Sequence, residues 1–484
     1  MDSYLAKAAL ACMLAAVLAV MASAQTPSQA PPAVYPAQLI SDLNALRDAA
    51  LASDYAYQQV AHLCDNIGPR MGGSAQAKQA EQYVAEQLKD LGLEIRLEDF
   101  PMSRWVRGAE AAELVEYAGQ APGTTQKVVL TTLSGSSATP PEGITADVIA
   151  VKNFDELKVL GRDKVAGKIV LFNVPFDKAK AANGYAGEAY GEAVAYRGNG
   201  GKAAAELGAA AALVRSVGGA EYRIPHTGYS RPAPVPAAAV TAEDADLIAH
   251  LTRQGRVRMH LVLTPQTLPE VTEHNVVADL RGTEHPEEIV IVSGHLDSWD
   301  LGTGAIDDGA GVAVAMETAH LIQQLHLHPR RTIRVIAWMD EENGGRGNTA
   351  YGKTHAQEMA NHAAVIESDL GAGHPLGYVA RVNPAAAAML KPMLEVMRPT
   401  GATVLRQVDR SPGSDIEPEV HAGVPGFAPL QDVQTYFNYH HTPADTLDKI
   451  VPRELQENAA AIAVLAYTLA NLPEKLPRES PGSP

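Results

Sequence analysis

The spacing of apolar residues predicts a helix followed by a strand in the N-terminal quarter of the chain. Apolar positions recur every three or four residues over 75–91, and Gly92 follows where such a helix would end. Residues 93–97 then alternate between apolar and polar side chains, as a strand with one buried face does.

After residue 271 the pattern becomes strand, loop and helix in repetition. The predicted strands are continuous apolar runs, which typify strands buried on both faces of a sheet. We therefore expect an α/β fold in which helices cover both faces of a central sheet. In such folds ligands bind beyond the carboxyl ends of the strands, so we expect the chemistry there. The predicted strands span 289–293, 332–338 and 363–366, and the predicted helices span 309–325 and 455–472.

The stretch from 115 to 270 has a different texture, and we interpret it as an inserted domain. Short strand-like runs alternate with turns rich in glycine and proline, and an alanine-rich segment near 201–207 predicts a helix. Metal-binding residue types do not cluster in this stretch, so we expect no chemistry from the insert itself. Gly198-Asn199-Gly200-Gly201 follows no clear strand, and we expect a loop there rather than a dinucleotide site.

The first 24 residues have the pattern of a signal peptide. An apolar run over 8–21 is short for a membrane span, and Ala22-Ser23-Ala24 offers a cleavage site. The expected protein is therefore secreted or periplasmic, without stable membrane insertion after cleavage. At the other end of the chain, 476–484 is expected to be a flexible tail.

Residue types that bind metals follow the predicted strands after residue 271. Taken singly, each has an ordinary explanation, because an acid before a helix often only caps that helix. Their joint occurrence at successive strand ends predicts a metal centre. Histidines mixed with carboxylates suit zinc, and a carboxylate can also bridge two ions. The candidates are His295 and Asp297, the pair Asp307-Asp308, the pair Glu341-Glu342, Asp369, and the pair His440-His441.

These residue types match what the hydrolysis of an amide requires. Bound divalent ions lower the pKa of a water molecule and polarise the carbonyl group. One carboxylate must stay off the metal to take a proton from the water and pass it to the leaving amine. Adjacent glutamates can divide the two roles, because their side chains diverge from the backbone.

The motifs, in this order, resemble zinc peptidase family twenty-eight from about Tyr55 to the final helix. The resemblance implies a zinc exopeptidase fold, with a mixed central sheet sandwiched by helices and an inserted, β-rich protease-associated domain. The expected parts are 25–114 and 271–475 for the peptidase domain and 115–270 for the insert. The resemblance also assigns ligands for two zinc ions: His295 and Asp369 for one, Glu342 and His441 for the other, with Asp307 bridging both and Glu341 as general base and acid.

Further roles rest on the same resemblance, which is strongest to the carboxypeptidase Q branch of the family. Asp297 is expected to hold a ligand histidine in its tautomer through its carboxylate. His440, Ser414 and Asp415 are expected at the substrate. The implied substrate is a dipeptide or short peptide, with an aminopeptidase acting on longer peptides as the alternative. A homodimer is compatible with the sequence.

Other classes of protein are less well supported. A net charge of −17 disfavours binding to nucleic acid or to an anionic membrane. A serine hydrolase is disfavoured because the sequence contains no Gly-x-Ser-x-Gly elbow. A glutaminyl-cyclase-like transferase and a non-enzymatic transferrin-receptor-like protein share the expected fold. The retention of all five ligand positions argues against both.

Overall fold

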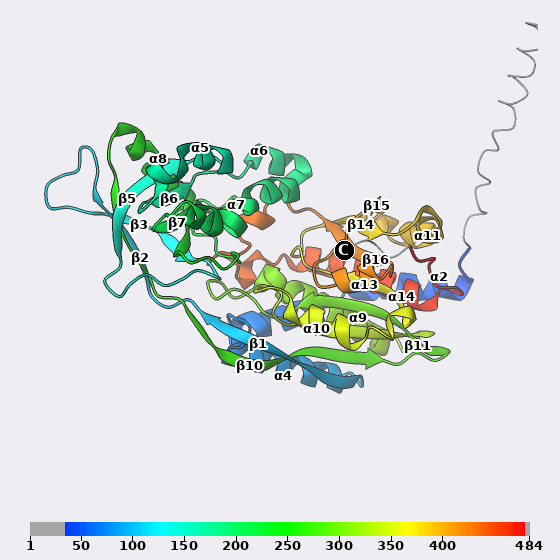
Figure 1. Ribbon diagram of the computed structural model, residues 1–484. Helices are drawn as coiled ribbons and strands as arrows, with labels where there is room; N and C mark the ends of the chain where they lie inside the picture. Colours follow the sequence, from blue (N-terminus) through cyan, green and yellow to red (C-terminus); the bar gives the residue numbers. More distant parts are fainter. Residues whose placement is uncertain (1–33, 480–484) are drawn as a thin grey trace, which may run out of the picture.

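The computed structural model describes residues 34–479. Two mixed α/β parts lie at opposite ends of the molecule, each built on an eight-stranded sheet (Figure 1). We call them the main sheet and the insert sheet. The strands of the main sheet are, in spatial order, β1 (Glu94–Val106), β10 (Gln266–Leu280), β12 (Arg331–Trp338), β11 (His285–His295), β13 (His362–Glu367), β16 (Gly426–Gln431), β14 (Pro375–Arg381) and β15 (Val404–Gln407).

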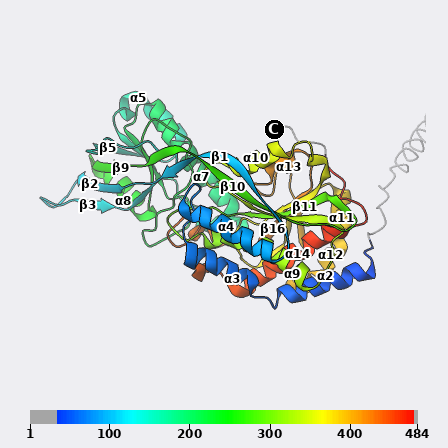
Figure 2. The same cartoon turned by 90° about the horizontal axis from the view of Figure 1, so that it is seen from below.

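Helices cover both faces of the main sheet, as the continuous apolar strands predict. Alternate residues of β11 face opposite ways: Val290 and Val292 join one core cluster, and Ile289 and Ile291 join another. Figure 2 shows several helices of the first face from below. That face carries α2 (Ala37–Ala50), α3 (Tyr55–His62), α4 (Ala75–Asp90), α9 (Ala310–Gln324), α11 (Pro384–Met389), α12 (Lys391–Val396) and α14 (Pro452–Asn471), and the other carries α10 (Arg346–Thr354) and α13 (Glu417–His421).

The expected α/β class with a mixed, helix-covered sheet is confirmed. β11 lies between β12 and β13 and is parallel to both. β1 and β10 pair antiparallel at one edge, which makes the sheet mixed. Because the three parallel strands run the same way, the segments that follow them meet at one edge.

The insert consists of the chain between β1 and β10, and it holds helices as well as a sheet. The predicted boundaries at 115 and 270 fall inside β2 and β10, because the β1–β10 ribbon is longer than the short alternating pattern at 93–97 suggested. The insert strands are β2 (Glu110–Glu116), β3 (Gln126–Val128), β4 (Leu130–Thr132), β5 (Ile144–Val151), β6 (Ile169–Phe172), β7 (Ala211–Arg215), β8 (Ala237–Val240) and β9 (Arg258–Leu263), and its helices are α5 (Phe154–Val165), α6 (Lys178–Lys180), α7 (Ala186–Glu206) and α8 (Ala242–Gln254).

The glycine-rich segment expected to form a loop lies inside helix α7, so that prediction is wrong. The reason is packing. A Cβ atom on Gly200 would lie 3.0 Å from the Phe172 ring, and one on Gly201 would lie 3.3 Å from the Cβ of Ala233. The glycines therefore let the helix approach the insert sheet closely, and this contact outweighs their poor helix propensity.

Gly200→Val is expected to destabilise the protein by about 1–3 kcal/mol, because the added side chain overlaps the Phe172 ring. Gly198→Ala is the matched control: nothing lies within 4 Å of its added methyl group. In a helix, alanine is favoured over glycine by about 0.5–1 kcal/mol. Denaturant unfolding of both variants measures the two changes. Equal destabilisation by both substitutions would contradict the packing account.

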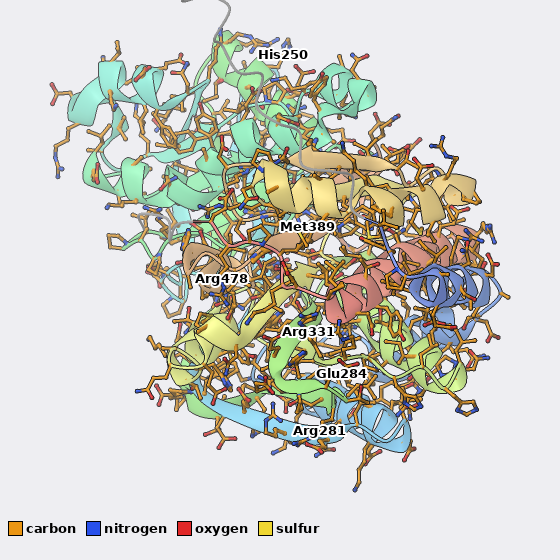
Figure 3. The ribbon with its side chains drawn as sticks, turned by 90° about the vertical axis from the view of Figure 1, so that its right-hand side faces the viewer. His250, Arg281, Glu284, Arg331, Met389 and Arg478 are labelled. Atoms are coloured by element: carbon orange, nitrogen blue, oxygen red, sulfur yellow. The ribbon has the colours of Figure 1, made fainter. Side chains whose placement is uncertain are left out.

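The C-terminal residues pack more closely than the expected flexible tail. Leu476 is buried. Arg478, labelled in Figure 3, donates a hydrogen bond from Nη2 to the carbonyl of Met359 at 2.6 Å. Residues 476–479 therefore contact the folded chain, and a flexible tail over 476–484 stays a prediction. The predicted signal peptide lies outside the described residues. Within 34–479, no helix has both the length and the apolar character needed to cross a membrane.

Candidate active site

The predicted metal-binding residues lie beyond the carboxyl ends of the three parallel strands. β11 ends at His295, β12 leads to Glu342, and β13 leads to Asp369. Asp307 lies in the turn before α9, and His441 lies in the loop between β16 and α14. The structure thus brings together residues that are up to 146 positions apart, counted from His295 to His441 (441 − 295).

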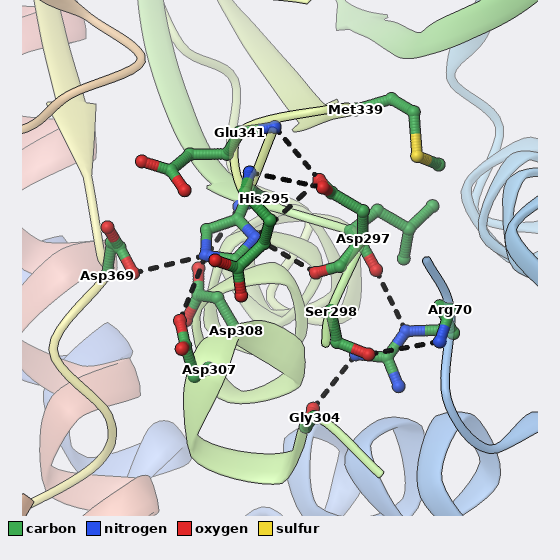
Figure 4. Close-up of polar contacts among 12 residues, drawn as sticks. Arg70, His295, Asp297, Ser298, Gly304, Asp307, Asp308, Met339, Glu341 and Asp369 are labelled. Carbon is green, nitrogen blue, oxygen red and sulfur yellow. Dashed lines mark hydrogen bonds and ion pairs between the residues drawn. The ribbon is translucent and has the colours of Figure 1, made fainter. Parts of the chain in front are cut away.

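His295 forms the first half of the cluster. Its Nε2 lies 3.1 Å from Asp307 Oδ1 and 3.3 Å from Asp369 Oδ1 (Figure 4). Its Nδ1 lies 2.9 Å from the backbone carbonyl of Asp297, which accepts a hydrogen bond when Nδ1 carries the proton. In that tautomer the Nε2 lone pair faces the two carboxylates, as metal ligation requires.

His441 forms the second half. Its Nε2 lies 3.1 Å from Glu342 Oε2 and 3.2 Å from Asp307 Oδ2. Its Nδ1 lies 3.3 Å from the carbonyl oxygen of Thr227. Asp307 therefore lies between the two histidines with one carboxylate oxygen toward each, which is the arrangement of a bridging ligand.

The atoms left without partners fit metal cations. Within residues 34–479, Asp307 Oδ2 and Glu342 Oε1 are buried and accept no hydrogen bond. Burial raises the pKa of Glu342 to about 8, so this carboxylate needs a neutralising proton or cation. Imidazole nitrogen and carboxylate oxygen together are ligands that zinc accepts.

Asp308 is a second acid that could compete with Asp307 for this role. One atom each of His295, Asp308 and Asp369 lies within 4.8 Å of the others. Both Asp308 oxygens, however, accept backbone hydrogen bonds, from His295 at 3.1 Å and from Gly311 at 2.9 Å. Asp308 therefore ties the end of β11 to the start of α9, and Asp307 has the free oxygen.

Asp297 supports the site differently from expectation. Its carboxylate Oδ1 is 3.7 Å from His295 Nδ1, whereas its backbone carbonyl makes the hydrogen bond. The carboxylate instead accepts the backbone N–H of Glu341 at 3.2 Å and of Glu342 at 3.3 Å. Asp297 thus orients the histidine with its main chain and the glutamate pair with its side chain.

Glu341 has the properties of a general base beside this cluster. In the described part of the chain it forms no ion pair with either histidine, and Ser414 Oγ donates a hydrogen bond to its Oε1 at 2.9 Å. Burial, reinforced by the charge of Asp369, raises its pKa to about 7. A carboxyl group that exchanges its proton near neutral pH suits this role. Ser414, expected at the substrate, therefore orients Glu341.

The other two predicted substrate contacts have different positions. Asp415 is 1% exposed, and its backbone N–H donates to Glu367 Oε2 at 2.9 Å. A substrate contact for Asp415 stays a prediction. His440 stacks on His441 with ring centroids 3.7 Å apart, and it lines the pocket that contains the cluster. A substrate contact for His440 stays a prediction.

The insert reaches this pocket, which corrects the expectation that it brings no chemistry. The pocket, which we call the central pocket, has a volume of about 860 Å³ including open solvent, and Tyr190, Arg197 and Tyr229 of the insert line it. The backbone N–H of Thr227 donates to the carbonyl of His441 at 2.9 Å. His441 has a φ of 59°, a region that residues other than glycine rarely occupy, and this contact helps to hold it there.

Sequence patterns missed Arg70, Arg197 and His226, and the His226 ring lies 5.4 Å from that of His441. Arg70 is fully buried, and its guanidinium donates to the carbonyls of Leu296 at 2.8 Å and Gly304 at 2.9 Å, which fixes the loop that carries Asp307 (Figure 4). The only signal for Arg70 in the sequence is the preceding Gly68-Pro69 pair, which is typical of a turn. The sequence holds no signal for Arg197 or His226.

Comparison with known proteins shows the family to which the chain belongs. The family described as Peptidase family M28 matches residues 275–466. Carboxypeptidase Q of Bos taurus is 37% identical over 434 residues, which cover 88% of this chain and 88% of the relative. The resemblance that the motifs indicated is thereby confirmed.

Solved structures agree as well. The peptidase M28 precursor from Shewanella amazonensis is 35% identical with a TM-score of 0.86, over 92% of this chain and 99% of that one. An aminopeptidase from Aneurinibacillus sp. strain AM-1, at 22% identity and a TM-score of 0.63 over 92% and 100%, shares the fold. This chain therefore belongs to peptidase family M28 and is a metallo-exopeptidase.

Proposed function

We propose that this chain is an exported di-zinc exopeptidase that cleaves dipeptides and short peptides with a free C-terminal carboxylate. His295 and Asp369 would hold one zinc ion, and Glu342 and His441 the other. The two oxygens of Asp307, one toward each histidine, support its role as the shared ligand. The signal-peptide pattern supports export.

The proposed substrate class rests on the position and surroundings of Arg197. Arg197 is 8% exposed, and its Nη1 donates a hydrogen bond to the Tyr190 hydroxyl at 2.6 Å. Its charge is unpaired, because within 34–479 no carboxylate lies within 4 Å of it. Its buried Nε has no hydrogen-bond acceptor in that part of the chain. A Cβ at Gly228 would lie 2.4 Å from the Arg197 Cζ, so a glycine keeps room for the guanidinium.

An unpaired buried cation is costly unless a ligand supplies the missing anion. A peptide's terminal carboxylate matches a guanidinium in charge and in planar shape. Because Arg197 lines the same pocket as Glu341 and Asp307, it can hold the carboxylate while the adjacent peptide bond faces the base. This favours short peptides with a free C-terminus over the aminopeptidase alternative.

The chain's own residues account for the proton transfers. Zinc ions, when bound, would polarise the scissile carbonyl and make a water molecule more acidic. Glu341, held at Oε1 by Ser414, takes the proton of the attacking water and returns it to the leaving amine. Asp297 keeps the glutamate pair in place through its two backbone contacts.

The substrate class is tested with dipeptides whose C-terminus is either free or amidated, with bound zinc measured in the same preparation. We expect about two zinc ions per chain and faster cleavage of the free acids. Arg197→Gln should lower kcat/KM for free acids about 10- to 100-fold and hardly change it for amides, because it removes a charged hydrogen bond.

A wild-type enzyme that cleaves free and amidated dipeptides equally well would contradict the carboxylate assignment. Preference for long peptides with a blocked C-terminus would favour the aminopeptidase alternative. Cyclisation of an N-terminal glutamine, without hydrolysis, would favour the transferase.

A further inference from the structure

The two histidines of the cluster have their Nδ1 contacts from different parts of the molecule. His295 Nδ1 lies 2.9 Å from the backbone carbonyl of Asp297, only two residues further along the same loop. His441 Nδ1 lies 3.3 Å from the backbone carbonyl of Thr227, which lies between β7 and β8 in the insert. The first half of the cluster therefore has this contact within its own loop, whereas the second half depends on the insert.

The Thr227 carbonyl favours one tautomer of His441. Arg197 Nη1 also lies within hydrogen-bond distance of His441 Nδ1, at 3.2 Å. A guanidinium has donors only, so of these two groups only the carbonyl can accept a proton from Nδ1. With the proton on Nδ1, the lone pair of Nε2 is free for a metal ion. A carbonyl of the insert thus favours the form of His441 that can be a ligand.

An ion pair at the base of the insert holds Thr227 in this position. Arg107 is 8% exposed and lies between β1 and β2, where the chain passes from the main sheet into the insert. Its Nε donates to Asp300 Oδ2 at 2.9 Å, and its Nη2 donates to the Thr227 hydroxyl at 3.2 Å. Asp300 lies on the loop after β11, three residues beyond Asp297. One guanidinium therefore joins the loop of the first half to the insert segment that contacts His441.

Further contacts fix the direction of the Arg107 side chain. Its Nη1 donates to the Thr131 hydroxyl at 2.6 Å and to the carbonyl of Thr132, both in β4 of the insert. Its Cζ lies 5.0 Å from the centre of the Trp105 ring, which meets the Trp299 ring edge-on with centroids 6.1 Å apart. Removal of the carboxylate partner would leave this buried charge uncompensated, so the insert would lose its hold on the loop after β11.

The other ligand of the second half also has the insert beside it. Ser134, just after β4, donates a hydrogen bond from its Oγ to Asn343 Oδ1 at 2.6 Å. Asn343 directly follows Glu342 in the sequence. The insert therefore contacts the chain at His441 and next to Glu342, the two residues that form the second half with Asp307.

We propose that Arg107 and Asp300 are positioning residues for the second zinc ion. Their ion pair keeps Thr227 against His441 and thereby keeps this histidine in its ligating tautomer. That role rests on the proposed function, which assigns one zinc ion to Glu342 and His441. Loss of the ion pair should weaken this zinc ion and spare the other. By reciprocity, zinc in the second half should hold the insert more firmly.

Zinc titration with a competing chelator tests this role in Asp300→Ala. We expect about two zinc ions per chain in the wild type. In the variant one of them should bind about 10- to 100-fold more weakly, the range for loss of a residue that supports a ligand, and the other should bind as before. Adding Asp300→Ala to Glu342→Gln should leave the remaining tight zinc ion unchanged, because both substitutions act on the same ion.

Hydrogen exchange gives a second readout that does not depend on activity. The backbone N–H of Thr227 donates to the carbonyl of His441 at 2.9 Å. In the wild type, zinc should slow exchange of this N–H, and in Asp300→Ala the slowing should be smaller. A role of the ion pair in general stability alone would change exchange equally with and without zinc, and this outcome would overturn the proposal.

Asp279→Ala is the matched control. Asp279 also binds one arginine with both oxygens, because Arg334 Nε and Nη2 donate to it at 2.7 and 2.8 Å, but this pair lies in the main sheet. The substitution should lower the free energy of unfolding and leave both zinc affinities nearly unchanged. Loss of the same zinc ion from Asp279→Ala and Asp300→Ala would mean that any weakening of the fold releases it, and would overturn the proposal.

Thr227→Val provides a milder variant, which decides the matter if Asp300→Ala does not fold. It keeps the size of the side chain and removes the hydroxyl that Arg107 contacts, so it should weaken the same zinc ion by a smaller factor. Two zinc ions bound as tightly in the variants as in the wild type would overturn the role of the ion pair alone. A wild-type enzyme that binds at most one zinc ion would instead overturn the proposed function, and this role with it.

Discussion

Glu341→Gln is expected to lower kcat by about 10²- to 10⁴-fold, the range for a lost general base, while zinc stays bound. Glutamine has the same size and can still accept the Ser414 hydrogen bond at Oε1, but it cannot take a proton. The fall should therefore appear in kcat and hardly in KM. Steady-state kinetics on a dipeptide, together with zinc per chain, measures both effects.

Glu342→Gln is the control for this result, because the two glutamates are neighbours with opposite assignments. Glu342 Oε2 lies 3.1 Å from His441 Nε2, so its replacement should lower zinc content as well as activity. Loss of zinc from Glu341→Gln and its retention in Glu342→Gln would shift the assignment by one residue. Near-normal turnover in both variants would mean that the glutamates only support the turn after β12.

Asp307→Asn is expected to weaken zinc binding by more than the ~10- to 100-fold typical of residues that only support a ligand. Asp307 faces His295 with one oxygen and His441 with the other, and asparagine has only one oxygen and no charge. Activity should fall with the zinc content. Zinc titration with a competing chelator measures the affinity of each variant.

Asp308→Asn tests whether zinc binding depends on Asp307 as a ligand or only on nearby negative charge. The oxygens of Asp308 serve backbone N–H groups, so its replacement should lower the free energy of unfolding and leave zinc affinity nearly unchanged. If Asp308→Asn loses zinc and Asp307→Asn keeps it, the shared ligand is Asp308.

Local sequence patterns were sufficient for the three parallel strands of the main sheet and for the residue types that follow them. The strands β11, β12 and β13 are long apolar runs, and their order along the chain fixes which loops meet. The ligand types follow these runs directly, so the positions of His295, Glu342 and Asp369 could be predicted.

Contacts between distant segments could not be predicted in this way. Gly200 looks like a turn residue, and only the ring of Phe172 beneath it explains why a helix continues there. Arg197 lies on an alanine-rich helix, 244 residues before the His441 that it approaches. No periodicity encodes such a pairing. The role of Asp297 depended on backbone geometry, which residue types do not specify.

The bond between Thr227 and His441 also determines when the site becomes complete during synthesis. A chain grows from its N-terminus, so the insert emerges before His441 does. The last histidine of the cluster can then dock on the insert, and this contact helps to hold its unusual backbone conformation. The order of segments along the chain thus places synthesis of the insert ahead of the last histidine of the cluster.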